Sequence, residues 1–167
     1  MYNWYEISRK EIEKLYSDDA ELFIDILAAT SPRKRVKENW RLSQQIYESY
    51  LAGDINLKGC MPAHKGNVSR AIAREPLQGR KVRAFAEALK GNMDVVVVDI
   101  WIGRWFGFET ITNKTYDFIE NAIRMMAAAC GRKPAELQAE LWCDMIREYG
   151  QHPVSYADVV DKQLYLW

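Results

Sequence analysis

Residues 76–104 read PLQGRKVRAFAEALKGNMDVVVVDIWIGR, and the expected fold class follows from this stretch. Gly79 supplies a tight turn, and the residues after it predict a helix through about Lys90. Four consecutive valines at 95–98 favour a strand by propensity. No partner strand is visible elsewhere in the chain, so we interpret them as a buried approach to a second helix, capped by Asp99. The stretch therefore predicts helices joined by loops and no sheet.

The rest of the chain also has helical patterns. Ser31 followed by Pro32 predicts the N-cap and first residue of a long helix, and Asp18 and Glu21 have the capping-box spacing. The expected helices cover residues 18–29, 31–52, 67–74, 113–130, 134–149 and a short segment from 155. We therefore expect an all-α protein, a single compact multi-helix domain over residues 1–167.

The composition is that of a folded protein. Of 167 residues, 49% are apolar, with six Trp and nine Tyr, which argues against disorder. The N-terminus mixes charges, and no apolar run reaches the roughly 18 residues that span a bilayer, so we expect a soluble, cytoplasmic protein. Cys60, Cys130 and Cys143 have no paired spacing, which argues against a disulfide framework and against zinc. We expect Cys130 and Cys143 in the core.

The net charge is zero, but the charges are unevenly distributed. Residues 1–30 hold 3 basic and 7 acidic groups, residues 31–83 hold 12 and 4, and residues 84–167 hold 8 and 12. A basic middle between acidic ends suits a face on a phosphate backbone. Solvated helix faces would give the same counts, so charge alone leaves both interpretations open.

Lys81 and Asp99 form the candidate catalytic pair, 18 residues apart. Lys81 follows a turn and lies at the start of a helix, and Asp99 lies at the start of a second helix. This arrangement resembles the catalytic segment of helix-hairpin-helix DNA glycosylases with lyase activity, such as the 8-oxoguanine DNA glycosylases. The resemblance implies an enzyme that flips a damaged or modified base out of DNA and excises it. Lys81 would be the nucleophile and Asp99 the stabilising carboxylate.

The likeness covers roughly residues 25–145 and extends to small phage and archaeal members of that superfamily. Residues 28–32 resemble the segment that places a loop in the minor groove, residues 81–85 the second hairpin helix, and residues 134–142 the closing helix. It implies DNA contacts from Ser31, Arg33, Lys34, Arg35, Lys37, Asn39, Gly79, Arg80 and Arg83, and a base pocket with Phe85, Gln138 and Trp101. It further implies double-stranded DNA as partner, no cofactor or metal, a monomer, and a phage gene expressed in a bacterial host.

The chemistry fits these residue types. Breaking the bond between a base and deoxyribose C1′ gives the sugar oxocarbenium character, which a nearby carboxylate stabilises. Backbone N–H groups at a helix N-terminus are expected to hold Asp99 ionised. Lys81 must lose its proton to attack, and Arg80 or Arg83 is a candidate cationic neighbour.

The chain departs from the pattern at several positions. Leu77 stands where the hairpin usually has its first glycine, and Phe85 stands where some 8-oxoguanine enzymes have a smaller residue, so base specificity is not carried over. The four-cysteine cluster of endonuclease III is absent. His64, expected in a loop, has no metal-ligand partner at close spacing.

Two alternatives remain open. The chain could be a diverged phage enzyme that modifies bases in DNA, or a non-catalytic DNA-binding domain. A Lys in a first helical turn is usually solvated, an Asp before a helix is usually only a cap, and Trp105 and Phe106 are expected in the core. The geometry discriminates: Lys81 and Asp99 in one cleft with the basic stretch favour an enzyme, and Lys81 in open solvent favours a binding module.

Overall fold

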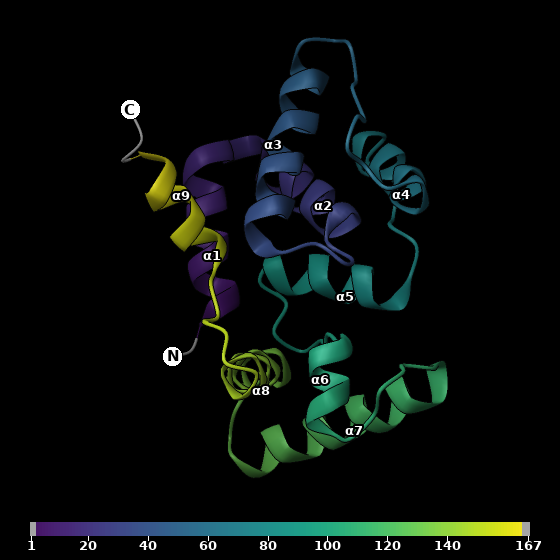
Figure 1. Cartoon of the computed structure of the whole chain (residues 1–167), viewed down its shortest axis with the longest axis vertical. Coiled ribbons are helices and arrows are strands. Elements are labelled where there is room, and N and C mark those ends of the chain that lie inside the picture. The colour runs from purple at the N-terminus through teal and green to yellow at the C-terminus, as the bar shows by residue number, and fades with distance from the viewer. Residues whose placement is uncertain (1–2, 165–167) are drawn as a thin grey trace.

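The computed structural model describes residues 3–164, with side chains from residue 3 to residue 160. This part of the chain is all-helical and contains no strand, which confirms the predicted fold class. The helices are α1 Trp4–Tyr16, α2 Ala20–Thr30, α3 Val36–Leu51, α4 Pro62–Ile72, α5 Arg80–Leu89, α6 Ile100–Trp105, α7 Asn113–Ala129, α8 Pro134–Glu148 and α9 Tyr156–Leu164, with a short 3-10 helix, η1 Ser17–Asp19 (Figure 1).

The stretch of residues 76–104 folds as predicted. Gly79 precedes α5 with φ of +100°, and no neighbouring atom would meet a Cβ there, so the backbone angle alone favours glycine. The valines at 95–98 form no strand and lead into α6; Val95 is partly buried, and the three that follow are buried. Asp99 caps α6, and its side chain accepts a hydrogen bond from the Ile102 N–H at 2.9 Å. The turn glycine at Gly79 and the N-cap at Asp99 were therefore enough to predict where α5 and α6 begin.

The N-terminal third differs from the prediction. α1 is absent from the predicted helices because its buried face, Trp4, Tyr5, Ser8 and Ile12, includes a polar residue and alternates with charges. The capping box of Asp18 and Glu21 does not form, because the N-cap of α2 is Asp19, whose side chain makes no capping hydrogen bond.

Ser31 is not the N-cap of the long helix. Its hydroxyl donates to the Ala28 carbonyl at 2.9 Å, so it ends α2, and α3 begins only at Val36 with Arg35 as N-cap. Residues 31–35 therefore form a loop, in which Arg33 has the left-handed φ of 61°. A left-handed non-glycine residue costs of order 1–3 kcal/mol, which the surrounding structure must offset.

The helices pack around two hydrophobic clusters. The larger joins α1, α2, α3, α4, α5 and α9, and the smaller joins α6 and α7. Both clusters also take residues from the valine segment and from α8. Figure 1 shows the second group below the first, with α8 beside the start of α1. Trp142 of α8 packs against both clusters, so the junction between them lies next to this residue.

Several burial predictions need correction. Cys130 follows the end of α7 and is exposed, whereas Cys143 is buried as expected. Trp105 is 40% exposed at the end of the six-residue helix α6, in which only Ile102 and Gly103 are buried. His64 is buried on α4 rather than placed in a loop. None of the helices in the described part of the chain is long and apolar enough to cross a membrane.

Candidate active site

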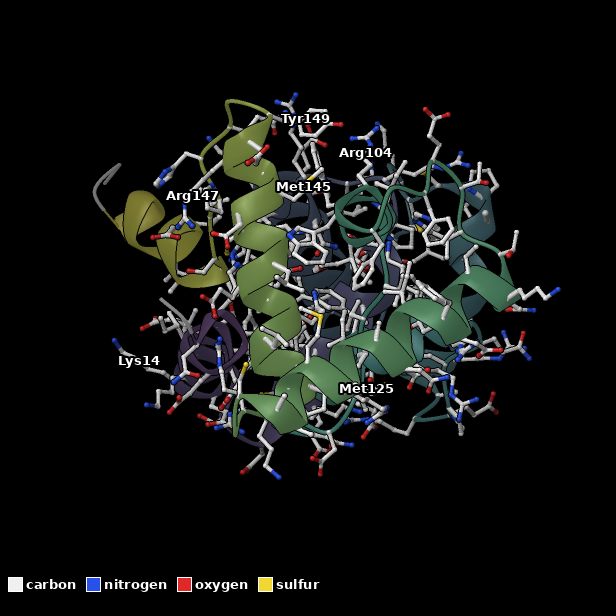
Figure 2. All side chains as sticks on the ribbon, turned by 90° about the horizontal axis from the view of Figure 1, so that it is seen from below. Lys14, Arg104, Met125, Met145, Arg147 and Tyr149 are labelled. Carbon is white, nitrogen blue, oxygen red and sulfur yellow. The ribbon has the colours of Figure 1, made fainter. Side chains whose placement is uncertain are left out.

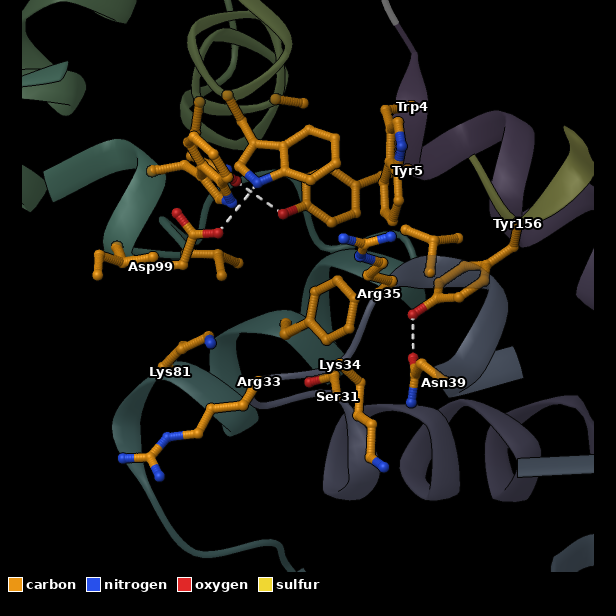
Figure 3. A pocket seen from close by; sticks show the side chains of 18 residues that line it. Trp4, Tyr5, Ser31, Arg33, Lys34, Arg35, Asn39, Lys81, Asp99 and Tyr156 are labelled. Carbon is orange, nitrogen blue, oxygen red and sulfur yellow. Dashed lines mark hydrogen bonds between the residues drawn. The ribbon is translucent and has the colours of Figure 1, made fainter. Parts of the chain in front are cut away.

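A cavity of about 300 Å³ opens at the junction of the two clusters. Its walls come from the start of α1, the loop 31–35, the first turn of α3, the first six residues of α5, residues 97–101, one face of α8 and the first residue of α9. Segments from both ends and the middle of the chain thus meet around one hollow (Figure 3).

Lys81 and Asp99 both line this cavity. Lys81 is the second residue of α5 and is partly buried, and Figure 3 shows its side chain reaching into the cavity below Asp99. The charge of Lys81 acts on the Asp99 carboxylate and lowers its pKa, although burial raises that pKa more. The turn at Gly79 and the cap at Asp99 therefore bring an amine and a carboxylate into one space.

Asp99 is held by donors from α6 and α8. Its carboxylate accepts from the Ile102 N–H at 2.9 Å and from the Trp142 Nε1–H at 3.0 Å. Burial nevertheless raises the pKa of Asp99, against the opposing effects of these hydrogen bonds and of Lys81. The expectation that the helix terminus keeps this carboxylate ionised is therefore too simple, because desolvation outweighs the donors.

Gln138 lines the cavity from α8 and is 3% exposed. Its Oε1 accepts the hydroxyl of Tyr5 at 2.7 Å, which ties α8 to α1. Burial raises the pKa of Tyr5 well above its ordinary value, and the nearby charge of Asp99 raises it further. Tyr5 therefore stays a neutral donor to Gln138.

Aromatic rings form one wall. Trp4 is central to it, with ring centroids 6.2 Å from Phe85, 5.7 Å from Trp142 and 5.5 Å from Tyr156. All four line the cavity, and Trp101 lines it from α6. Such a wall can stack a flat ring.

Arg104 supports Trp101 from outside the cavity. Its guanidinium lies 4.9 Å from the Trp101 ring centroid and 5.3 Å from that of Tyr149, and the two rings meet edge to face at 5.2 Å. Figure 2 shows Arg104 and Tyr149 near each other at one edge of the molecule. This cation–π cluster restricts the Trp101 side chain.

The loop 31–35 brings positive charge to the cavity. Ser31, Arg33, Lys34 and Arg35 line it, whereas Lys37 is exposed on α3 outside it. Figure 3 shows Arg35 turned inward beside Tyr5 and Tyr156, with Arg33 and Lys34 extending away.

The pKa of His64 is affected by several cations of the cavity at once. Burial lowers the pKa of the His64 imidazole, and the charges of Lys34, Arg33 and Lys81 lower it further. Three cations from two segments therefore act on one residue of α4. The side of the cavity near α4 is electropositive.

Other predicted contacts lie outside the cavity. Arg80 pairs with Asp117 at 2.5 Å and Glu120 at 2.7 Å and stacks over the Tyr116 ring at 4.1 Å. It is therefore committed to α7 and is no free cation beside Lys81. Gly79 and Arg83 are exposed and do not line the cavity.

Asn39 lines the cavity but its amide is already engaged. Its Nδ2 donates to the Leu27 carbonyl at 3.0 Å and to the Thr30 hydroxyl at 2.8 Å, and its Oδ1 accepts the hydroxyl of Tyr156. The residue is 1% exposed. It therefore joins α2, α3 and α9, and a contact with DNA would require it to give up one of these bonds.

The sequence pattern missed four aromatic residues that line the cavity, Trp4, Tyr5, Trp142 and Tyr156. Trp4 and Tyr5 belong to the unpredicted α1, and Tyr156 comes from the last helix, more than 50 residues after Asp99. Trp142 ends the closing-helix segment 134–142, whose spacing alone gave no reason to single it out. An amphipathic interpretation of residues 4–16 was the one available signal. Among the described residues no group of three or more His, Cys, Asp or Glu could hold a metal ion.

The comparisons with known proteins identify a family without a known role. The family described as "Family of unknown function (DUF7178)" matches residues 2–149, and the chain belongs to it. The match ends before α9, which supplies Tyr156 to the cavity. No curated protein and no solved structure matches the chain.

Proposed function

We propose that this member of DUF7178 is a DNA glycosylase of the helix-hairpin-helix type with AP-lyase activity. It would flip a damaged or modified base from double-stranded DNA into the cavity and excise it, with Lys81 as nucleophile and Asp99 as stabilising carboxylate. The proposal includes a monomer acting in the cytoplasm of a bacterial host, encoded by a phage.

One observation carries the proposal. Lys81 and Asp99, which lie 18 residues apart, both line one cavity together with the basic loop 31–35. A surface lysine and a simple helix cap would have no reason to share a hollow with an aromatic wall. A nucleotide entering this hollow would have its base against the rings and its phosphates near the cations.

The chemistry can be written with the residues that line the cavity. Lys81 gives up a proton to become a free amine, and Asp99 is the one carboxylate among the described lining residues. Because burial raises the pKa of Asp99, this carboxylate accepts a proton more readily than an exposed one. The Lys81 amine then attacks C1′, the bond from C1′ to the base breaks, and the departing base takes up the proton.

The lyase step follows from the covalent product. Ring opening of the sugar converts the C1′ adduct into a Schiff base with Lys81, which acidifies the C2′ proton. Loss of that proton expels the 3′ phosphate and cuts the strand, and water then hydrolyses the Schiff base and restores the amine. As Asp99 passes its proton to the departing base it becomes ionised, and the carboxylate then stabilises the positive charge that develops on the sugar.

Borohydride trapping tests the proposal. The protein is mixed with duplexes that each carry one damaged or modified base, and borohydride reduces any Schiff base to a stable crosslink. We expect a crosslink with at least one duplex, and its loss in Lys81→Gln. Lys114→Gln is the matched control, since Lys114 is also the second residue of a helix but is exposed on α7.

A crosslink that survives in Lys81→Gln would assign the nucleophile to another residue. DNA binding without a crosslink on any duplex would favour a non-catalytic DNA-binding domain. Modified bases that remain attached to the sugar would favour a base-modifying enzyme.

A further inference from the structure

Arg35 differs from the other cations of its loop. Arg35 is an exposed residue that lines the open cavity, and Figure 3 shows its guanidinium turned toward Tyr5 and Tyr156, while Arg33 and Lys34 extend away. The backbone carbonyl of Arg35 accepts from the Asn39 N–H at 2.8 Å, but within the described part of the chain its guanidinium has no hydrogen bond, ion pair or ring contact. An unpaired guanidinium offers a planar fork of N–H donors to whatever enters.

Gln138 adds another donor. Its Oε1 is occupied by the Tyr5 hydroxyl at 2.7 Å, and its Nε2 has no acceptor among the described residues. A glutamine with both groups free pairs with adenine through its oxygen and nitrogen together. Gln138 has committed its oxygen to Tyr5, so it presents mainly N–H to the cavity.

The cavity therefore offers N–H donors from Arg35 and from Gln138, and aromatic rings form one of its walls. Its volume of about 300 Å³ is at the small end of ligand pockets, which suits a single flat ring system. An exocyclic amine placed against Arg35 and Gln138 would set donor against donor and leave both sides unpaired. A carbonyl oxygen at the same place would accept from either side chain.

We infer that the cavity selects a nucleobase that presents a carbonyl oxygen, and not an exocyclic amine, to Arg35 and Gln138; the deaminated bases hypoxanthine and uracil belong to this class, whereas adenine and cytosine do not. This inference rests on the proposed function and names the substrate class of the same site. Arg35 and Gln138 are its specificity-determining residues. Hypoxanthine suits the fork of Arg35 because O6 and N7 are adjacent acceptors, whereas adenine offers only N7 beside an amine.

The test compares bases that differ in this one group. Four otherwise identical duplexes carry hypoxanthine, adenine, uracil or cytosine opposite an abasic site, so that none of the four is held by a pairing partner. Binding is measured by fluorescence anisotropy at one fixed salt concentration, because the phosphate contribution depends on salt. We expect the wild-type protein to bind each carbonyl base at least about tenfold more tightly than its amine counterpart.

Three variants locate the source of the preference. Arg35→Gln should bring the ratio to within about twofold, and Arg35→Lys should keep most of the affinity while lowering the ratio, because it retains the charge but loses the fork. Gln138→Glu should also lower the ratio, since it still accepts from Tyr5 but has no N–H. Lys37→Gln is the matched control: it removes one positive charge outside the cavity and should weaken all four duplexes alike. Thermal unfolding verifies that each variant is folded.

Equal affinity for both members of each pair, or preference for the amine, would overturn the inference. The same follows if Arg35→Gln weakens all four duplexes by one factor, because Arg35 would then contact phosphate. The proposed function and this inference can be told apart. If the wild-type protein binds none of the duplexes, both are refuted. If it shows the base preference but gives no borohydride crosslink, only the chemistry assigned to Lys81 is refuted.

Discussion

The bond from Trp142 to Asp99 gives the sharpest test of the site's electrostatics. Trp142→Phe removes the Nε1–H donor, 3.0 Å from Asp99 Oδ2, and keeps an aromatic ring against Trp4. A hydrogen bond to a charged group contributes about 1.5–3 kcal/mol. Because the lost hydrogen bond favours the ionised carboxylate, the variant should raise the pKa of Asp99 further.

The sign of the stability change follows from the direction of the shift. Burial raises the pKa of Asp99 in the folded protein, so the unfolded chain ionises first as the pH rises. The contribution of Asp99 to stability is therefore largest below its unfolded pKa and falls as the pH rises toward the folded pKa. Trp142→Phe raises the folded pKa further, so it should destabilise the protein by about 1.5–3 kcal/mol more at neutral pH than in acid, where the carboxyl is protonated in both states.

Denaturant unfolding of wild-type protein and variant across the acid-to-neutral range measures this difference. The control is the same substitution in an Asp99→Asn background, where the carboxyl is gone and the pH dependence of the Trp142 effect should vanish. A loss of stability that is the same at all pH values would refute the reasoning, because it would show that Trp142 contributes packing and not stabilisation of the charged carboxylate.

Three further outcomes are expected. Asp99→Asn should bind DNA almost as the wild type does but slow base excision strongly, measured by single-turnover kinetics, and near-normal excision would leave Asp99 only as a helix cap. Neutralising the four basic residues within 33–37 should flatten the dependence of log affinity on log salt by up to about 0.9 for each DNA phosphate that is no longer neutralised, and an unchanged slope would place DNA on another face. Gly79→Ala should cost about 1–3 kcal/mol in denaturant unfolding, because φ is +100° and no clash adds to the backbone strain, so a neutral substitution would contradict the turn assignment.

Local signals in the sequence determined the helices around the candidate site. The turn at Gly79, the approach of residues 95–98 and the cap at Asp99 each depend on dihedral preferences and hydrogen bonds within a few residues. These are written in short stretches of chain, so the sequence predicts them without knowledge of the fold. Ser31 shows the limit, because a serine can end one helix as well as begin the next, and its neighbours do not decide between them.

The hydrogen-bond partners in the cavity and the pKa of Asp99 depend on contacts between distant parts of the chain, so the sequence alone does not predict them. Trp142 reaches Asp99 from 43 residues away, and Tyr5 reaches Gln138 from 133 residues away. Sequence alone indicated an ionised cap at Asp99, whereas the packing of α8 against α6 buries the carboxylate and raises its pKa. Desolvation depends on everything that displaces water around a group, and the groups that do so here come from distant parts of the chain. The inward turn of Arg35 has the same origin, since the rings beside it, Tyr5 and Tyr156, belong to the first and last helices.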